Sequence, residues 1–110
     1  MKKGKKDVYN LPFVPLGKDM LFNCQEWREL SPAARDIYIM LKAKYNRKNN
    51  GELQLYYSEL QKIKGLKNPQ TISRAFKELE DKEWIERVEI GGLYRIPNKY
   101  RLTGKWDKHL

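Results

Sequence analysis

The chain has 110 residues, 40% of them hydrophobic, which fits a single domain with a core of three helices and a small sheet. Its 23 Lys and Arg exceed its 14 Asp and Glu, and the formal net charge of +9 favours a polyanionic partner. For a protein of this size, nucleic acid is a commoner partner of this kind than a membrane surface. A lone cysteine, Cys24, excludes a disulfide within the chain, and a lone histidine beside the C-terminus, His109, excludes histidine-based catalysis or a zinc site in the core. We expect a cytoplasmic protein, because no segment has the roughly 20 apolar residues of a membrane span. From the same residue inventory we expect no enzymatic activity, metal or cofactor.

The first 17 residues are expected to lie outside the folded domain. Residues 1–7 predict a mobile arm whose lysines either follow a DNA backbone or serve solubility: Lys2, Lys3, Lys5 and Lys6. Prolines make residues 8–17 extended. We expect the domain to span residues 18–106, with a short tail at residues 107–110.

Capping residues predict the first helices. Asn23 and Glu26 form a capping pair for a short helix that ends at Leu30. Ser31 and Pro32 occupy the cap and the first position of a longer helix. One apolar face follows at helical spacing: Ala34, Ile37, Tyr38, Leu41 and Tyr45. Cations gather at the end of this helix, where the helix dipole favours them: Lys42, Lys44, Arg47 and Lys48.

In the middle of the chain, the sequence pattern predicts a turn, a short strand and a short helix. Residues 49–51, Asn-Asn-Gly, are typical of a turn, and residues 52–56 alternate polar and apolar side chains as a half-buried strand does. Residues 58–64 predict about two helical turns, and Gly65 ends them.

A third helix and a hairpin complete the pattern. Asn68 and Pro69 begin a helix that runs to about residue 82, with an inward face at Ile72, Ala75, Phe76 and Leu79. Residues 84–90 predict a strand, glycines 91 and 92 a turn, and residues 99–103 a returning strand. The residues between, 93–98, are either strand extension or a loop.

The resulting order of elements resembles the winged helix-turn-helix family, the fold of many bacterial repressors and of plasmid and phage replication initiators. The resemblance rests on residues 57–66, 71–80 and 84–86, while residues 22–50 are similar to the entry helices of replication-initiator-type members. It covers about residues 18–106. It implies a mainly α fold with a small antiparallel sheet, a three-helix core with a β-hairpin wing, and DNA binding.

Two positions depart from the family pattern. Tyr56 stands where a Ser or Thr cap usually precedes the second helix, and Glu83 replaces the glycine commonly found before the wing. Both departures affect local geometry and leave the expected fold unchanged.

The polar face of the third helix supports DNA binding independently of the resemblance. At 100° per residue, the side chains opposite the apolar face can hydrogen-bond base edges and phosphates: Gln70, Arg74 and Lys77, flanked by Thr71 and Ser73. The acids are confined to the C-terminal half: Glu78, Glu80, Asp81 and Glu83. This order opposes the helix dipole but leaves the N-terminal half free to enter a major groove. An ordinary solvated face is the alternative.

The candidate DNA contacts extend beyond this stripe. Lys67 and Asn68 precede the helix. On the hairpin, Arg95 is expected at the wing tip on phosphate or in the minor groove, and Lys99 and Arg101 share a face of the returning strand.

We therefore expect sequence-specific binding of double-stranded DNA, with residues 69–82 in the major groove and a basic wing at residues 87–103. The role is that of a replication-initiator-like module or a transcriptional regulator. The apolar surface of the helix that begins at Ser31 and the segments around Trp27 and Trp106 offer surface for a homodimer. The alternatives are a protein–protein adaptor, or a protein that binds RNA or single strands.

Overall fold

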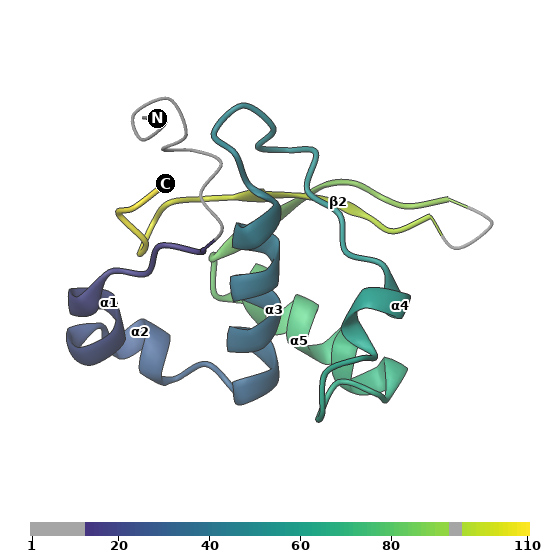
Figure 1. Cartoon of the computed structure of the whole chain (residues 1–110), viewed down its shortest axis with the longest axis horizontal. Coiled ribbons are helices and arrows are strands. Elements are labelled where there is room, and N and C mark those ends of the chain that lie inside the picture. The colour runs from purple at the N-terminus through teal and green to yellow at the C-terminus, as the bar shows by residue number, and fades with distance from the viewer. Residues whose placement is uncertain (1–12, 93–95) are drawn as a thin grey trace, which may run out of the picture.

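The computed structural model describes residues 13–92 and 96–110. Its elements follow the chain in the order α1 Lys18–Asn23, α2 Gln25–Arg28, α3 Pro32–Lys44, α4 Tyr57–Leu60, α5 Pro69–Asp81, β1 Ile85–Glu89 and β2 Lys99–Leu102. In Figure 1, α3 stands at the centre with α1 and α2 on one side and α4 on the other, while the β1–β2 hairpin crosses the upper part of the view and extends past α4. The described chain is a mainly helical, compact domain with a C-terminal two-stranded antiparallel hairpin.

Helix α3 begins at the predicted residue and buries the predicted apolar face. The Ser31 hydroxyl oxygen accepts a hydrogen bond from the Ala34 N–H at 3.2 Å, and Pro32 takes the first helical position. The apolar face is buried at Ala34, Ile37, Tyr38 and Leu41, each 0% exposed. Ser31 also ties α3 to α5, because its N–H and its hydroxyl donate to the Glu78 carboxylate at 2.8 and 2.7 Å.

Helix α5 confirms the predicted cap and inward face. The Asn68 side-chain oxygen accepts a hydrogen bond from the Gln70 N–H at 2.8 Å. The buried residues are Ile72, Ala75 and Leu79. Phe76 is only partly buried, and its ring stacks on Tyr100 of β2 with centroids 4.8 Å apart. Helix α5 therefore packs between α3 and the hairpin.

The turn between α5 and β1 contains the unusual Glu83. This residue has a left-handed backbone conformation, with φ of 64°. Its N–H donates to the Glu80 carbonyl at 3.0 Å, and the Trp84 N–H donates to the Leu79 carbonyl at 2.9 Å. These two bonds form a Schellman motif, in which glycine usually occupies the left-handed position. Glutamate here adopts a conformation that glycine reaches at lower cost.

Both predicted hairpin strands form, within one residue of the expected bounds. Ile85 lies opposite Leu102 and Arg87 opposite Tyr100, and a bulge shifts the register between Arg87 and Glu89. The buried side chains of this pairing are Tyr100 and Leu102, on one face of β2, and Ile85 at the start of β1. That face packs on the helices and leaves the opposite face to solvent.

The strand expected at residues 52–56 does not form. Leu53 alone pairs with β2, through two backbone hydrogen bonds to Tyr100 at 3.2 and 2.8 Å. Leu53 and Leu55 are buried, 1% and 2% exposed. The alternation of polar and apolar residues thus indicated burial of one face correctly, but a strand also requires continued backbone pairing with a neighbour, and only Leu53 is paired.

Two helical predictions were wrong in their bounds. Residues 18–28 form α1 and α2 instead of a single helix begun at Asn23, whose amide donates to Asp19 within α1 at 2.8 Å. The element expected at residues 58–64 is also shorter, because helix α4 ends at Leu60. The chain then turns to Gly65, which has the left-handed backbone expected of it, with φ of 92°.

Lys42 meets the C-terminal segment inside the domain. Lys42 and Asp107 are 3% and 2% exposed, and Lys42 Nζ lies 2.9 Å from Asp107 Oδ2. The Tyr38 hydroxyl donates to the same carboxylate at 2.6 Å, and Lys42 donates to the Pro15 carbonyl at 2.6 Å. Lys42 lies in the last turn of α3 as predicted, but it is buried and paired, and the segment expected as a tail supplies its carboxylate partner.

Candidate nucleic-acid interface

The N-terminal half of α5 and the turn before it form one polar surface. Its exposed side chains are Lys67, Asn68, Gln70, Ser73, Arg74 and Lys77, with Thr71 half-buried. The structure therefore brings the predicted contacts of the third helix together. Asn68 also has a structural role as the cap of α5, so its side-chain oxygen is already bonded.

Arg74 is an exposed cation that the described protein leaves unpaired. Its guanidinium forms no hydrogen bond or ion pair with any residue in the described ranges. Lys77, one turn later, lies 3.3 Å from Asp81, and these side chains are 76% and 61% exposed. An ion pair this exposed is weak. Both cations can therefore bind an anion at little cost.

The turn that leads into α5 carries two further cations. The Gln61 side-chain amide donates to the Lys67 carbonyl at 3.4 Å, and Lys67 Nζ donates back to the Gln61 carbonyl at 3.1 Å. Between these anchors, Lys62 and Lys64 are exposed. Neither has a hydrogen bond or ion pair within the part of the chain that the structure describes. We did not single out these two lysines from the sequence.

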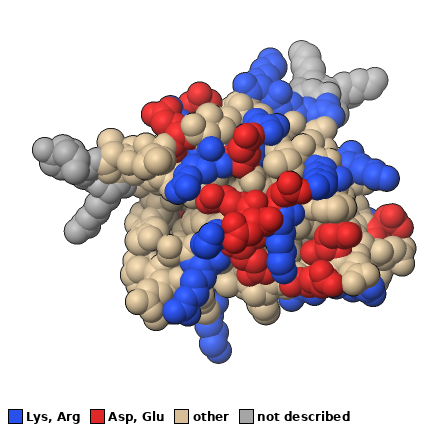
Figure 2. All heavy atoms as spheres, turned by 180° about the vertical axis from the view of Figure 1, so that it is seen from behind, with Lys and Arg blue, Asp and Glu red and all other residues tan. Residues whose placement is uncertain are grey.

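A signal for these lysines was present in the sequence as a run without acids. Between Glu59 and Glu78 the chain has no Asp or Glu but several cations: Lys62, Lys64, Lys67, Arg74 and Lys77. Acids resume in the second half of α5 and continue along the hairpin: Glu78, Glu80, Asp81, Glu83, Glu86 and Glu89. Figure 2 shows acids gathered at the centre of one face, with Lys and Arg among and around them and others projecting from its lower left edge. Positive and negative charge are therefore segregated along α5.

The predicted hairpin cations that the structure describes lie against carboxylates. Lys99 Nζ is 2.9 Å from Glu52 and 3.7 Å from Glu89, and the hydrogen bond to Glu52 raises the pKa of Lys99. The Arg101 guanidinium donates twice to one Glu86 oxygen, at 2.8 and 2.5 Å. Arg95, expected at the wing tip, lies outside the described residues.

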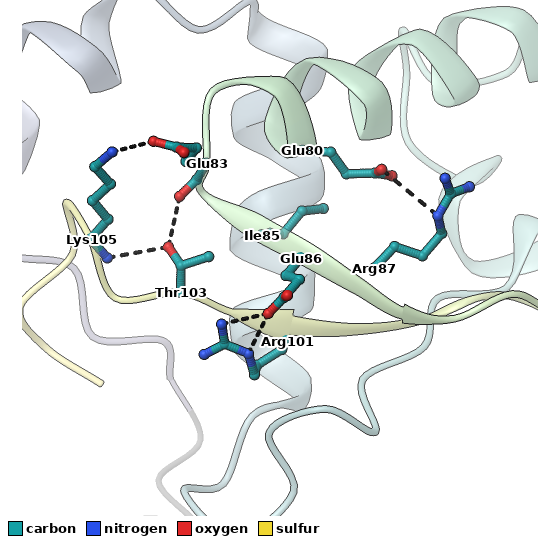
Figure 3. A pocket seen from close by; sticks show the side chains of 8 residues that line it. All are labelled: Glu80, Glu83, Ile85, Glu86, Arg87, Arg101, Thr103 and Lys105. Carbon is teal, nitrogen blue, oxygen red and sulfur yellow. Dashed lines mark hydrogen bonds and ion pairs between the residues drawn. The ribbon is translucent and has the colours of Figure 1, made fainter.

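The same pairing continues around a pocket between the end of α5 and the hairpin (Figure 3). Arg87 lies 3.8 Å from Glu80, and Lys105 pairs with Glu83. Because the cations drawn in this pocket face carboxylates, the pocket offers little surplus positive charge to a phosphate.

The described ranges, residues 13–92 and 96–110, contain neither a membrane-spanning helix nor a metal-binding cluster. None of the helices there is both long and apolar enough to cross a membrane. The His, Cys, Asp and Glu residues in these ranges include no group of three or more that could hold a metal ion. Comparisons with protein-family models, with curated proteins and with solved structures found no match to this chain.

Proposed function

We propose that this protein is a winged helix-turn-helix domain that binds double-stranded DNA with sequence preference and catalyses no reaction. In this proposal α4 and α5 are the helix-turn-helix, α5 is the recognition helix, and the β1–β2 hairpin is the wing. The observation that carries the proposal is the acid-free, exposed surface of the N-terminal half of α5, where Arg74 is unpaired among the described residues.

The chemistry of this surface fits a major groove. An α-helix enters the groove of B-form DNA, where Arg binds guanine and Gln binds adenine through paired hydrogen bonds. Arg74 and Gln70 lie one helical turn apart on the same exposed side of α5. The opposite side of the helix is buried at Ile72 and Leu79, each 0% exposed, so the protein holds the reading side chains on a rigid element. The resemblance to replication-initiator-type proteins favours replication over transcription as the process.

A protein–protein adaptor is the second candidate, because the hairpin exposes apolar side chains. Val88, Ile90 and Ile96 are 52%, 73% and 52% exposed. The region expected to form a dimer contact is less available, since Trp27 is 5% exposed and packs edge-on against Tyr38 and Trp84. An adaptor does not need an acid-free cationic helix face, so DNA binding accounts for more of the structure.

Binding to random duplex DNA at several salt concentrations tests the proposal first. If roughly four to six phosphates are neutralised, the slope of log affinity against log salt is about −4 to −5. Micromolar or tighter binding at low salt is expected. A slope near zero, or tighter binding to RNA or single strands than to duplex, contradicts the proposal.

Arg74→Ala then tests the role of α5 in reading sequence. We expect it to cost roughly 1–3 kcal/mol on a duplex selected from random DNA and much less on unselected duplex. Arg28→Ala on α2 is the matched control, because it removes one exposed arginine at the side of α3 opposite to α4 (Figure 1). Equal effects of the two substitutions on the selected duplex would show that α5 does not read the site.

A further inference from the structure

The cations of this protein fall into two groups that differ in what surrounds them. Lys62 and Lys64, in the turn before α5, have no ion pair in the described part of the chain. By contrast, Lys99 and Arg101 on β2 are paired with carboxylates at distances of 2.9 Å or less. The lysines of the turn can therefore bind an external anion without breaking an ion pair, whereas the two cations of β2 must first leave their carboxylates.

We infer that the DNA backbone is held by the α4–α5 turn, through Lys62 and Lys64, and that the described cations of the hairpin do not contact phosphate. This inference rests on the proposed function and adds a phosphate-binding site to it. The ligand is the sugar–phosphate backbone of the same duplex whose major groove receives α5.

The position of the turn brings it to the backbone. Lys64 lies four residues before Asn68, the cap of α5, and the turn is anchored to this point by the reciprocal bonds between Gln61 and Lys67. A helix that enters the major groove with its N-terminal residues brings the preceding turn to the phosphates that border the groove. The N-terminal end of the 13-residue helix α5 adds a partial positive charge there.

Glu59, the acid closest in sequence to this turn, is already occupied. Lys44 Nζ lies 2.6 Å from the Glu59 carboxylate, and this hydrogen bond is the main reason why the pKa of Glu59 is lowered. Lys62 adds only a small Coulombic contribution to that pKa and forms no ion pair with Glu59. The charge of Lys62 therefore remains available to an external anion.

The hairpin cations can bind a phosphate only after an existing ion pair is broken. For Arg101 to bind a phosphate, it must leave Glu86, and the released carboxylate then repels the phosphate. Lys99 faces two carboxylates, Glu52 and Glu89, so the same cost applies. Lys62 and Lys64 exchange only water and counterions, and the release of DNA counterions favours their binding.

Two double substitutions with equal charge change separate these surfaces. Lys62→Gln/Lys64→Gln removes two unpaired cations, and Lys99→Gln/Arg101→Gln removes two paired ones. The measurement is the salt dependence of binding to random duplex DNA, with thermal unfolding of each variant as the check on folding. All four side chains are at least partly exposed, so both variants are expected to fold.

Loss of two phosphate contacts should reduce the magnitude of the salt slope by about two and weaken binding roughly 10- to 100-fold at 0.1 M salt. We expect this result for Lys62→Gln/Lys64→Gln and a slope within about half a unit of wild type for Lys99→Gln/Arg101→Gln. A wild-type slope of the expected size with the opposite pattern, or with no effect of either variant, overturns the inference but leaves DNA binding standing. Failure of the wild-type protein to bind duplex overturns both.

Discussion

At the scale of single residues, Glu83 shows how a tertiary contact and a backbone requirement compete at one position. Its φ of 64° is the left-handed conformation in which an L-residue is disfavoured by roughly 1–2 kcal/mol. Its side chain pairs with Lys105 across the turn, but both side chains are about half exposed, at 61% and 47%. Such a pair contributes little. The backbone cost should therefore dominate the effect of substitution.

Glu83→Gly should raise the free energy of unfolding by roughly 0.5–1 kcal/mol, because glycine adopts the left-handed conformation without the Cβ clash. Chemical denaturation with urea measures the change. Glu83→Ala is the matched control, since it removes the ion pair and keeps the Cβ atom. Alanine that stabilises the protein as much as glycine would show that backbone strain is not the cause.

At the scale of elements, a stacked aromatic pair is one of the contacts that join α5 to the hairpin. The rings of Phe76 and Tyr100 are stacked, with 13° between their planes. Desolvation by the surrounding residues raises the pKa of Tyr100, although a hydrogen bond from Asn98 opposes this effect. The stack therefore lies in a partly dry layer between the proposed recognition helix and the wing.

Phe76→Ala should destabilise the fold by roughly 2–3 kcal/mol, less than the 3–5 kcal/mol of a fully buried aromatic, because Phe76 is only partly buried. Phe76→Leu retains apolar volume and should cost about 1 kcal/mol, the share that stacking adds. Thermal unfolding of the two variants checks this order. No loss of stability in Phe76→Ala would mean that the helix–hairpin contact is held elsewhere.

At the scale of the whole molecule, a buried ion pair joins segments that are far apart in the sequence. Asp107 accepts hydrogen bonds from Tyr38 and from the His109 N–H, and it pairs with Lys42, which also holds the Pro15 carbonyl. Burial disfavours the charged carboxylate, but these hydrogen bonds outweigh it and lower the pKa of Asp107. The two described ends of the chain are thereby fixed to α3.

Asp107→Asn should destabilise the protein by roughly 3–5 kcal/mol at neutral pH, because it leaves the Lys42 ammonium buried without a counter-charge. Lys42→Met/Asp107→Asn removes both charges and should recover at least half of that loss. Urea denaturation of the two variants and the wild type measures the coupling. A double variant no more stable than Asp107→Asn would mean that the buried charge is not the source of the loss.

The same carboxylate should make stability depend on acid pH. An unfolded Asp titrates near pH 3.9, and the folded pKa of Asp107 is lower. Its contribution is therefore complete above about pH 5 and is lost as the pH falls through the folded pKa. Below pH 4 the wild type should lose stability more steeply than Asp107→Asn does.

The sequence determined those features of this protein that depend on neighbouring residues. Ser31 and Asn68 cap α3 and α5 because the groups that they bond lie two or three residues away. The inward faces of these helices follow from a fixed rotation per residue, so the periodicity of the sequence is enough to place the exposed stripe at Arg74. For this reason the proposed interface on α5 could be predicted from the sequence.

The tertiary structure decided which charged side chains form ion pairs within the protein. Lys42 is buried because Asp107, which is distant in sequence, meets it, and Arg101 is paired because the hairpin register places Glu86 opposite. Residues 52–56 have the pattern of a strand, yet pairing required a partner edge, and only Leu53 found one. Periodicity encodes which side of an element is buried, whereas partners across space depend on how the elements pack, and no local pattern in the chain specifies that.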